Sequence, residues 1–170
     1  MKTKPLTFLL SLTFLFLFSG SVYGQEEVKK EYWDNGKIKS ETHYKNGKAN
    51  GPWTRWDEEG KKKFQGTFKD GKSVGPSTWW FKNGRKRSEG HFKDGEPDGL
   101  VTWWYENGKK KKEIHYKDGK ENGLWTEWSE DGRKKIEKHY KDGKENGLWT
   151  EWSEDGRKTF QGTFKDGNEL

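Results

Sequence analysis

Histidine side chains are the first candidates for metal chemistry in this chain, because they recur at multiples of 24 residues. They are His43, His91, His115 and His139. Threonine fills the same repeat position at Thr67 and Thr163. Ligands of one ion must lie within about 2 Å of it, whereas equivalent positions two strands apart lie roughly 10 Å from each other. The spacing therefore predicts a recurring surface position and no metal site.

The segment Asp118–Gly123 has the acidic, glycine-containing composition of a calcium loop. An EF-hand loop needs an acid or amide at its third position and a glutamate at its twelfth. Those positions hold Lys120 and Ser129, so a hairpin turn is the better interpretation. The chain has no cysteine nucleophile, and no glycine-rich phosphate loop opens a helix. The acids lie in repeated turns in which no copy stands out. We therefore predict no enzyme activity and no cofactor.

Tryptophan is the most informative residue type, with 11 copies in 170 residues. One series recurs every 24 residues, always two residues after a threonine and five after a glycine. The tryptophans are Trp56, Trp80, Trp104, Trp128 and Trp152, and the glycines are Gly51, Gly75, Gly99, Gly123 and Gly147. Since a strand alternates its side chains between two faces, each threonine and its tryptophan share one face. We interpret this series as a structural ladder.

The opposite face of the same strands varies from unit to unit and is rich in aromatic residues. It is the candidate binding face, and its members are Trp53, Trp79, Phe81, Trp103, Tyr105, Trp125 and Trp149. Aromatic side chains flanked by charge suit a carbohydrate, a peptide or a membrane interface. The alternative is that this face is the second half of the core. The sequence does not determine which residues of the following strand share this face.

Strands must position these residues, because the whole pattern has a period of 24. The signature Tyr/Phe-Lys-Asp/Asn-Gly begins at Tyr44, Phe68, Phe92, Tyr116, Tyr140 and Phe164. Five full periods run from 44 to 163, with half-units at 32–43 and 164–170. Asn-Gly and Asp-Gly pairs such as Asn35-Gly36 predict type I′ hairpin turns, and Asp118-Gly119 is expected to open a longer loop to Gly123. The predicted fold is all-β, an elongated antiparallel meander of β-hairpins in which each repeat contacts only its neighbours.

These units resemble the bacterial MORN (membrane occupation and recognition nexus) repeat variant. The likeness rests on segments such as Phe92–Gly95 followed by Gly99–Lys109, repeated in phase over residues 32–170. Choline-binding repeats are also rich in tryptophan and glycine, but their aromatic spacing fits less well. The resemblance implies an elongated hairpin sheet. Bacterial members are often labelled antitoxin components, and eukaryotic relatives are linked to membrane lipids and to scaffolding.

Residues 1–24 differ from the rest of the chain. Lys2 and Lys4 precede an apolar run from Leu6 to Phe18, which is followed by small and polar residues. This order predicts a secretory signal peptide cleaved near Gly24–Gln25, and the run is too short for the roughly 20 residues of a spanning helix. Residues 25–31 are expected to form a short polar linker before the repeat array at 32–170. The mature protein is then secreted or periplasmic.

Charge and composition direct the functional interpretation toward binding. Bases and acids are interspersed, 34 against 28, which is typical of a solvated surface and excludes a nucleic-acid stripe. The leading hypothesis is an exported, non-enzymatic protein-binding or scaffold module of the bacterial cell envelope, with a monomer favoured. One alternative is a glycan- or lipid-surface binder that uses the aromatic stripe. Another is an antitoxin-like neutralising protein, which the signal peptide disfavours.

Overall fold

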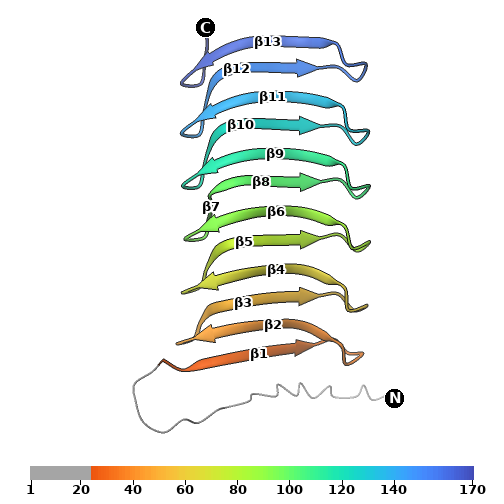
Figure 1. Ribbon diagram of the computed structural model, residues 1–170, viewed down its shortest axis with the longest axis vertical. Coiled ribbons are helices and arrows are strands. Elements are labelled where there is room, and N and C mark those ends of the chain that lie inside the picture. Colours follow the sequence, from red (N-terminus) through yellow and green to blue (C-terminus); the bar gives the residue numbers. More distant parts are fainter. Residues whose placement is uncertain (1–23) are drawn as a thin grey trace, which may run out of the picture.

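The computed structural model describes residues 24–170 as one open, antiparallel sheet of 14 strands (Figure 1). The strands are β1 (Glu26–Tyr32), β2 (Ile38–Lys45), β3 (Lys48–Trp56), β4 (Lys62–Lys69), β5 (Lys72–Trp80), β6 (Lys86–Lys93), β7 (Glu96–Pro97), β8 (Gly99–Trp104), β9 (Lys110–Lys117), β10 (Lys120–Trp128), β11 (Lys134–Lys141), β12 (Lys144–Trp152), β13 (Lys158–Lys165) and β14 (Asn168–Glu169). Each strand pairs with its neighbours in chain order, and the short β7 continues the line of β8 beside β6. The predicted all-β hairpin meander is confirmed.

The first hairpin begins earlier than the sequence suggested. Residues 25–31, expected as a polar linker, include most of strand β1, which pairs with β2 from Glu26↔Lys45 onward. This segment is a strand in spite of its five charged residues, because both faces of a single-layer sheet meet solvent and therefore tolerate charge. The predicted signal peptide lies almost wholly in residues 1–23, outside the described residues. No helix within residues 24–170 is long and apolar enough to span a membrane.

The two kinds of turn are the reverse of those predicted. Asp118 and Gly119 both have positive φ, 47° and 78°, and Lys117 pairs directly with Lys120. This is the two-residue type I′ hairpin, at the place where a longer loop was expected. The same left-handed pair recurs in every repeat, because aspartate and asparagine tolerate this conformation better than other side chains do.

The Asn-Gly segments form three-residue loops in place of type I′ turns. Only Gly36 is left-handed, with a φ of 79°. Its N–H donates to the Trp33 carbonyl at 2.9 Å, and the Trp33 N–H donates to Lys37 O at 2.9 Å. This is a type I turn closed by a glycine bulge. The Asn35 side chain explains the preference, since its Oδ1 accepts from the Lys37 N–H while its Nδ2 donates to Glu58 O of the next repeat.

The repeat glycines mark a second irregularity near the start of each long strand. Gly51 and Gly123 have φ values of 117° and 113°, and strand register shifts around them. A Cβ on Gly51 would lie 3.0 Å from Cβ of His43. Glycine is therefore required here by both backbone conformation and close approach.

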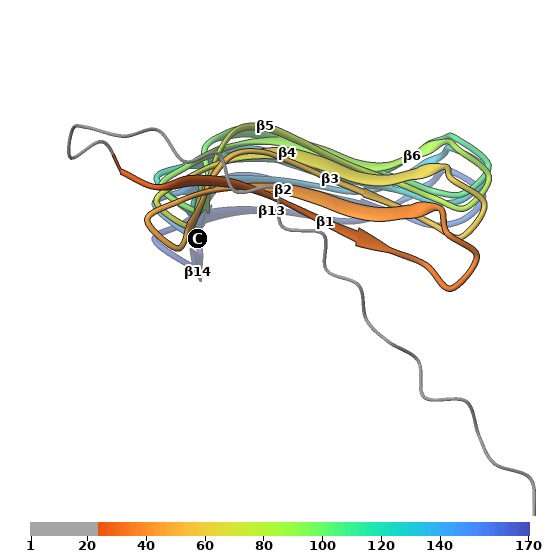
Figure 2. The ribbon, with the colours of Figure 1, turned by 90° about the horizontal axis from the view of Figure 1, so that it is seen from below.

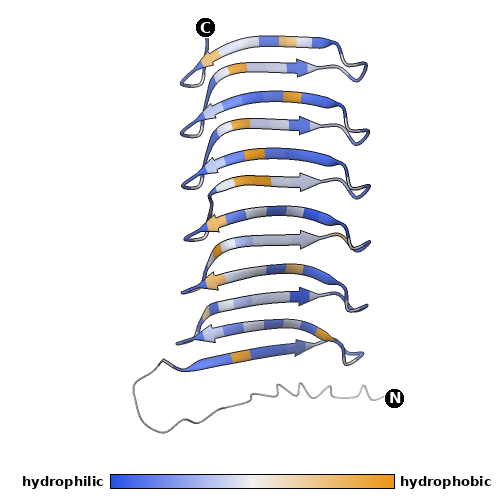
Figure 3. Ribbon diagram, viewed as in Figure 1, coloured by the Kyte–Doolittle hydropathy of each residue, from blue (hydrophilic) through white to orange (hydrophobic). Residues whose placement is uncertain are grey.

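The core consists of side chains on the two faces of a single sheet, with no second layer among residues 24–170. Seen along the stack, the strands of successive repeats lie nearly over one another (Figure 2). The buried hydrophobic residues are Phe64, Val101 and Ile114, and no large side chain is completely buried within residues 24–170. Hydrophobic residues appear as short separate segments on the strands (Figure 3). Hydrogen bonding and aromatic packing must therefore supply much of the stability.

Candidate functional site

Strand register separates the side chains into two faces, which we call the repeated face and the variable face. The repeated face carries the threonine and Trp104-type positions. The variable face carries the candidate binding residues, which alternate with these positions along the same strands. Phe64 contacts the rings of both Trp53 and Trp79, at centroid distances of 5.6 and 4.5 Å. The register thus supplies the assignment that the sequence left open: residues such as Phe64 of the following strand share the variable face.

The repeated face has the same composition in almost every repeat. Thr102, Thr126 and Thr150 are buried, each opposite an acid or amide of the adjacent strands. Lys110 illustrates the rest of the pattern: its Nζ lies 2.6 Å from Glu113 and 5.8 Å from the ring centroid of Trp128. The lysines Lys86 and Lys134 repeat this arrangement with Trp104 and Trp152. Three of these lysines pair with glutamates, while Lys62 and Lys158 bond glutamines at the same position. The five tryptophans are half-buried.

The candidate binding residues do not form one continuous aromatic stripe. Trp53 packs against Phe64 and Phe68, and its indole Nε1 is buried without a hydrogen-bond partner among the described residues. The next units place Ser77 and Val101 at the Trp53 position. Both are buried, with relative exposures of 4 % and 5 %. This row therefore resembles a core more than a contact surface.

The middle of the variable face combines exposed aromatic and basic groups. Trp79 is 41 % exposed and Trp103 is half-buried. Around them lie six bases, which together with these two tryptophans we call the basic patch: Lys39, Arg55, Lys63, Arg87, Lys111 and Lys112. Within residues 24–170 none of the six forms a salt bridge. The patch is thus a cluster of bases without salt-bridge partners in the described part of the chain.

Aromatic rings partly support three of these bases. Lys39 lies over the ring of Trp33 at 4.9 Å, and Lys111 over that of Tyr105 at 5.5 Å. Lys112 lies 5.0 Å from the Trp125 centroid. A ring face attracts a cation but does not remove its charge. Arg55, Lys63 and Arg87 lack even this contact among residues 24–170 and are exposed, so they are the groups most available to an anion.

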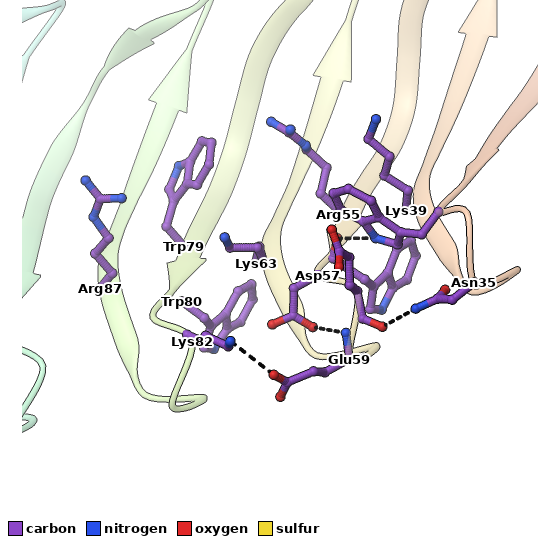
Figure 4. A pocket seen from close by; sticks show the side chains of 13 residues that line it. Asn35, Lys39, Arg55, Asp57, Glu59, Lys63, Trp79, Trp80, Lys82 and Arg87 are labelled. Atoms are coloured by element: carbon purple, nitrogen blue, oxygen red, sulfur yellow. Dashed lines mark hydrogen bonds and ion pairs between the residues drawn. The ribbon is translucent and has the colours of Figure 1, made fainter. Parts of the chain in front are cut away.

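A cavity of about 700 Å³ opens at the N-terminal end of the basic patch (Figure 4). It forms where Asp57 occupies the position held by Trp33, Phe81 and Tyr105 in neighbouring repeats. The side chains of Arg55, Lys63 and Trp79 line it, as Figure 4 shows. Replacing a large ring by a small carboxylate leaves the space between adjacent aromatic residues unfilled.

Two of the acids beside this cavity, Asp57 and Glu59, bind groups of nearby turns. Asp57 Oδ1 accepts hydrogen bonds from the N–H groups of Glu59 and Lys61, at 3.0 and 2.9 Å. Hydrogen bonds and charge from Lys61, 3.0 Å away, and from Lys82, 3.1 Å away, lower the pKa of Glu59. Asp57 and Glu59 thus form no salt bridge with Arg55, Lys63 or Arg87 within residues 24–170, although they line the same cavity.

The C-terminal part of the variable face, on β10–β13, has closed contacts. Lys138 Nζ lies 3.5 Å from the Trp149 centroid and 3.1 Å from Glu145 Oε1. Trp149 Nε1 donates to Glu151 at 3.1 Å, and Lys135 lies 3.9 Å from Glu127. Glu127 and Glu151 stand where the middle repeats have Trp103, Trp79 or Arg55. Trp125 and Trp149 are thus engaged within the protein.

The histidine row runs along the repeated face, near the type I′ turns. His115 Nδ1 lies 3.1 Å from Leu124 O, and His139 Nδ1 lies 3.2 Å from Leu148 O. In residues 24–170, no three histidine, aspartate or glutamate side chains are grouped as a metal site would require. Beside the histidines runs an aliphatic row, in which Val28, Leu100 and Leu148 are exposed.

Sequence reasoning missed the row of bases at Lys39, Lys63, Arg87 and Lys111. Each precedes a residue that is also on the variable face, as Lys63 precedes Phe64, so strict alternation fails at the bulge between the loop and the strand. The register passes from Trp56↔Lys62 to Arg55↔Phe64 and leaves Lys63 without an opposite residue. A base at this position in every repeat from Lys39 to Lys135 is a signal in the sequence, but the side it faces depends on that bulge.

One protein family matches the chain. The family described as MORN repeat variant matches residues 28–46, 49–70, 73–94, 97–118 and 121–142. The first match begins inside β1, and the last ends in the turn after β11. No similar protein was found among curated proteins.

Proposed function

Because this chain belongs to the MORN repeat variant family, we propose that it is a non-catalytic scaffold that binds another protein through the basic patch. We further propose that the chain is exported, on the strength of residues 1–24. The fold alone does not determine function. The observation that carries the proposal is the set of six bases around the exposed Trp79 and the half-buried Trp103 that form no salt bridge with any described residue.

The composition of the patch favours a protein partner. Residues that dominate binding energy at protein interfaces are enriched in tryptophan, tyrosine and arginine. Trp79, Trp103, Arg55 and Arg87 gather these types on one surface. A basic surface also accelerates association with an acidic partner. The alternative glycan or lipid binder would use a continuous stripe through Trp125 and Trp149, and both of these rings already contact protein side chains.

Photo-crosslinking in living cells tests the proposed function. Benzoylphenylalanine at Phe81, beside the patch, is expected to yield one protease-sensitive conjugate, identified by mass spectrometry. The same probe at Leu100, which is 42 % exposed on the repeated face, is the control. The conjugate should disappear when Arg55 and Arg87 become glutamine. Equal conjugates from both sites, or a conjugate unaffected by the glutamines, would overturn the proposal.

Export is tested separately by sequencing the N-terminus of the mature protein. Cleavage by a signal peptidase is expected to leave Gln25 first. Strand β1 begins at Glu26, so such cleavage keeps the whole sheet. An intact Met1 in the cytosol would contradict export and would favour the antitoxin-like alternative.

A further inference from the structure

Four of the six bases of the patch lie in a row with a regular step. Lys39, Lys63, Arg87 and Lys111 hold one repeat position on β2, β4, β6 and β9. Each is two strands from the next in the sheet order. Neighbouring strands lie about 4.8 Å apart, so the step is roughly 9.6 Å and the row spans roughly 29 Å. Figure 2 shows little rotation between successive repeats, so the row follows the long axis of the sheet.

This step selects among the conformations that a partner segment could adopt. Polyproline II has three residues per turn and a rise of about 3.1 Å, so every third side chain returns to the same side after about 9.3 Å. In a β-strand, residues three apart point to opposite faces. In an α-helix the nearest match is seven residues, about 10.5 Å, which drifts by roughly 3 Å over the row. Polyproline II alone keeps register with all four bases.

The chemistry around the row fits such a segment. Carboxylates are the natural partners of exposed arginine and lysine, and arginine can bind them in a bidentate manner. Trp79 and Trp103 lie beside the row, and aromatic-lined grooves are the usual receptors for polyproline II segments. Duplex DNA carries one charge about every 1.7 Å, far denser than this row.

We propose that the partner contributes an acidic polyproline II segment, with a carboxylate at every third residue, that lies along the row from Lys39 to Lys111. This inference rests on the proposed function, since it specifies which part of a protein partner occupies the basic patch. Each carboxylate meets one base of the row, and the prolines between them pack against the Trp79 and Trp103 rings. The segment is preorganised, so little conformational entropy is lost on binding.

Dye-labelled peptides test the spacing directly. One peptide repeats Glu-Pro-Pro and ends in glutamate. A second has the same composition with its glutamates adjacent, so that net charge is unchanged. Fluorescence anisotropy with the full chain is expected to show about tenfold tighter binding of the spaced peptide. Equal affinities would overturn the inference.

Neighbouring residues on opposite faces provide matched variants. Lys63→Gln with Arg87→Gln removes two bases of the row and is expected to weaken the spaced peptide about tenfold or more. Lys62→Gln with Lys86→Gln removes the same charge from the repeated face, where Lys62 bonds Gln65 and Lys86 pairs with Glu89. This control should change affinity less than about twofold. Equal weakening by both pairs would show non-specific charge attraction and contradict the proposal.

Two further probes separate other classes of partner. Hyaluronan oligosaccharides carry one carboxylate per disaccharide, and anionic phospholipid vesicles present a charged plane. Tighter binding of either than of the spaced peptide would overturn the inference. The crosslink at Phe81 distinguishes the two proposals, because a protein conjugate that persists while the peptides fail leaves the proposed function standing and removes only this inference.

Discussion

In the middle of the variable face, Arg55 and Arg87 lie beside Trp79 without an acidic partner among residues 24–170. On β10–β13 the same repeat positions form a closed set of contacts, in which Lys138 joins Trp149 to Glu145. Both regions have the same hairpin backbone and the same 24-residue period. A few substitutions at equivalent positions, such as Trp103 against Glu127, therefore decide whether a repeat satisfies its charges internally or leaves them for a partner.

Structural and binding roles are also divided within the variable face. The buried hydrophobic residues among residues 24–170 are Phe64, Val101 and Ile114, and the Phe64 ring packs against that of the exposed Trp79. Rigid packing beneath an exposed anchor limits the entropy that a contact surface loses on binding. The C-terminal repeats have half-buried rings that are held by lysines. We therefore expect the two regions to respond differently to equivalent substitutions.

The largest expected effect is on stability, from Ile114→Ala. Ile114 is 4 % exposed and lies opposite both Val101 and Trp125. Removing its side chain should cost about 2–4 kcal/mol, because the neighbouring strands cannot close the space. Ile136→Ala in the next repeat should cost about 1–2 kcal/mol, because Ile136 is only half-buried. Urea unfolding followed by tryptophan fluorescence measures both, and equal losses would contradict the proposed difference in packing.

Much of this architecture could be predicted from the sequence. A 24-residue period with glycine at each turn leaves little choice other than a hairpin meander, and Thr126 beside Trp128 follows from strict alternation. The predicted turn types were wrong, because the Asn35 side chain hydrogen-bonds the next repeat as well as its own loop. This tertiary contact cannot be seen in the sequence of one unit. The basic patch could not be predicted, since the bulge at Lys63 reverses the alternation.

The next largest loss of stability is expected when a glycine inside a strand is replaced by alanine. A Cβ on Gly66 would lie 2.7 Å from Ser77 Oγ and 2.8 Å from Phe64 Cζ, and both neighbours are buried. Gly66→Ala should therefore destabilise the fold by about 1–3 kcal/mol through overpacking. Gly162 meets Phe160 and the flexible end of Glu169 at similar distances, but Phe160 is only half-buried.

Gly162→Ala is thus the matched control and should cost less than about 1 kcal/mol, because its neighbours can move and alanine is the better strand residue. Both variants are compared by thermal unfolding with the parent protein. A larger loss at Gly162 would mean that the middle of the face is not the more rigidly packed region.

Replacing a lysine by alanine should affect the stability of the two regions differently. Lys138→Ala removes a cation from two tryptophan rings and leaves Glu145 without its ionic partner. The expected loss is about 1 kcal/mol. Lys63→Ala in the basic patch removes a base with no acidic partner among residues 24–170, and stability should change by less than about 0.5 kcal/mol. Similar losses in chemical unfolding would indicate that Lys63 has a structural role.

The smallest effect at neutral pH concerns Tyr140, on the variable face of β11. Burial, followed by the charge of Glu145, raises the pKa of Tyr140 from 10.0 to about 12. The hydroxyl lies 3.3 Å from Glu145 Oε1, which also accepts from Lys138. Since the folded state holds this proton more tightly than the unfolded chain does, its contribution to stability is fully present below about pH 10. That contribution is lost as the pH rises toward about 12.

Difference absorbance between the parent and Tyr140→Phe isolates this ionisation in an alkaline titration. The midpoint should lie well above the ordinary tyrosine value, and Glu145→Gln should lower it only in part, because burial is the larger cause. Tyr105, at the edge of the basic patch, also has a raised pKa from burial and from Glu127. Its Oη donates to Trp128 O at 2.8 Å, so it should be unaffected by Glu145→Gln. A Tyr140 midpoint near 10 would show that the C-terminal contacts are open in solution, and the two regions would then differ less than their static packing implies.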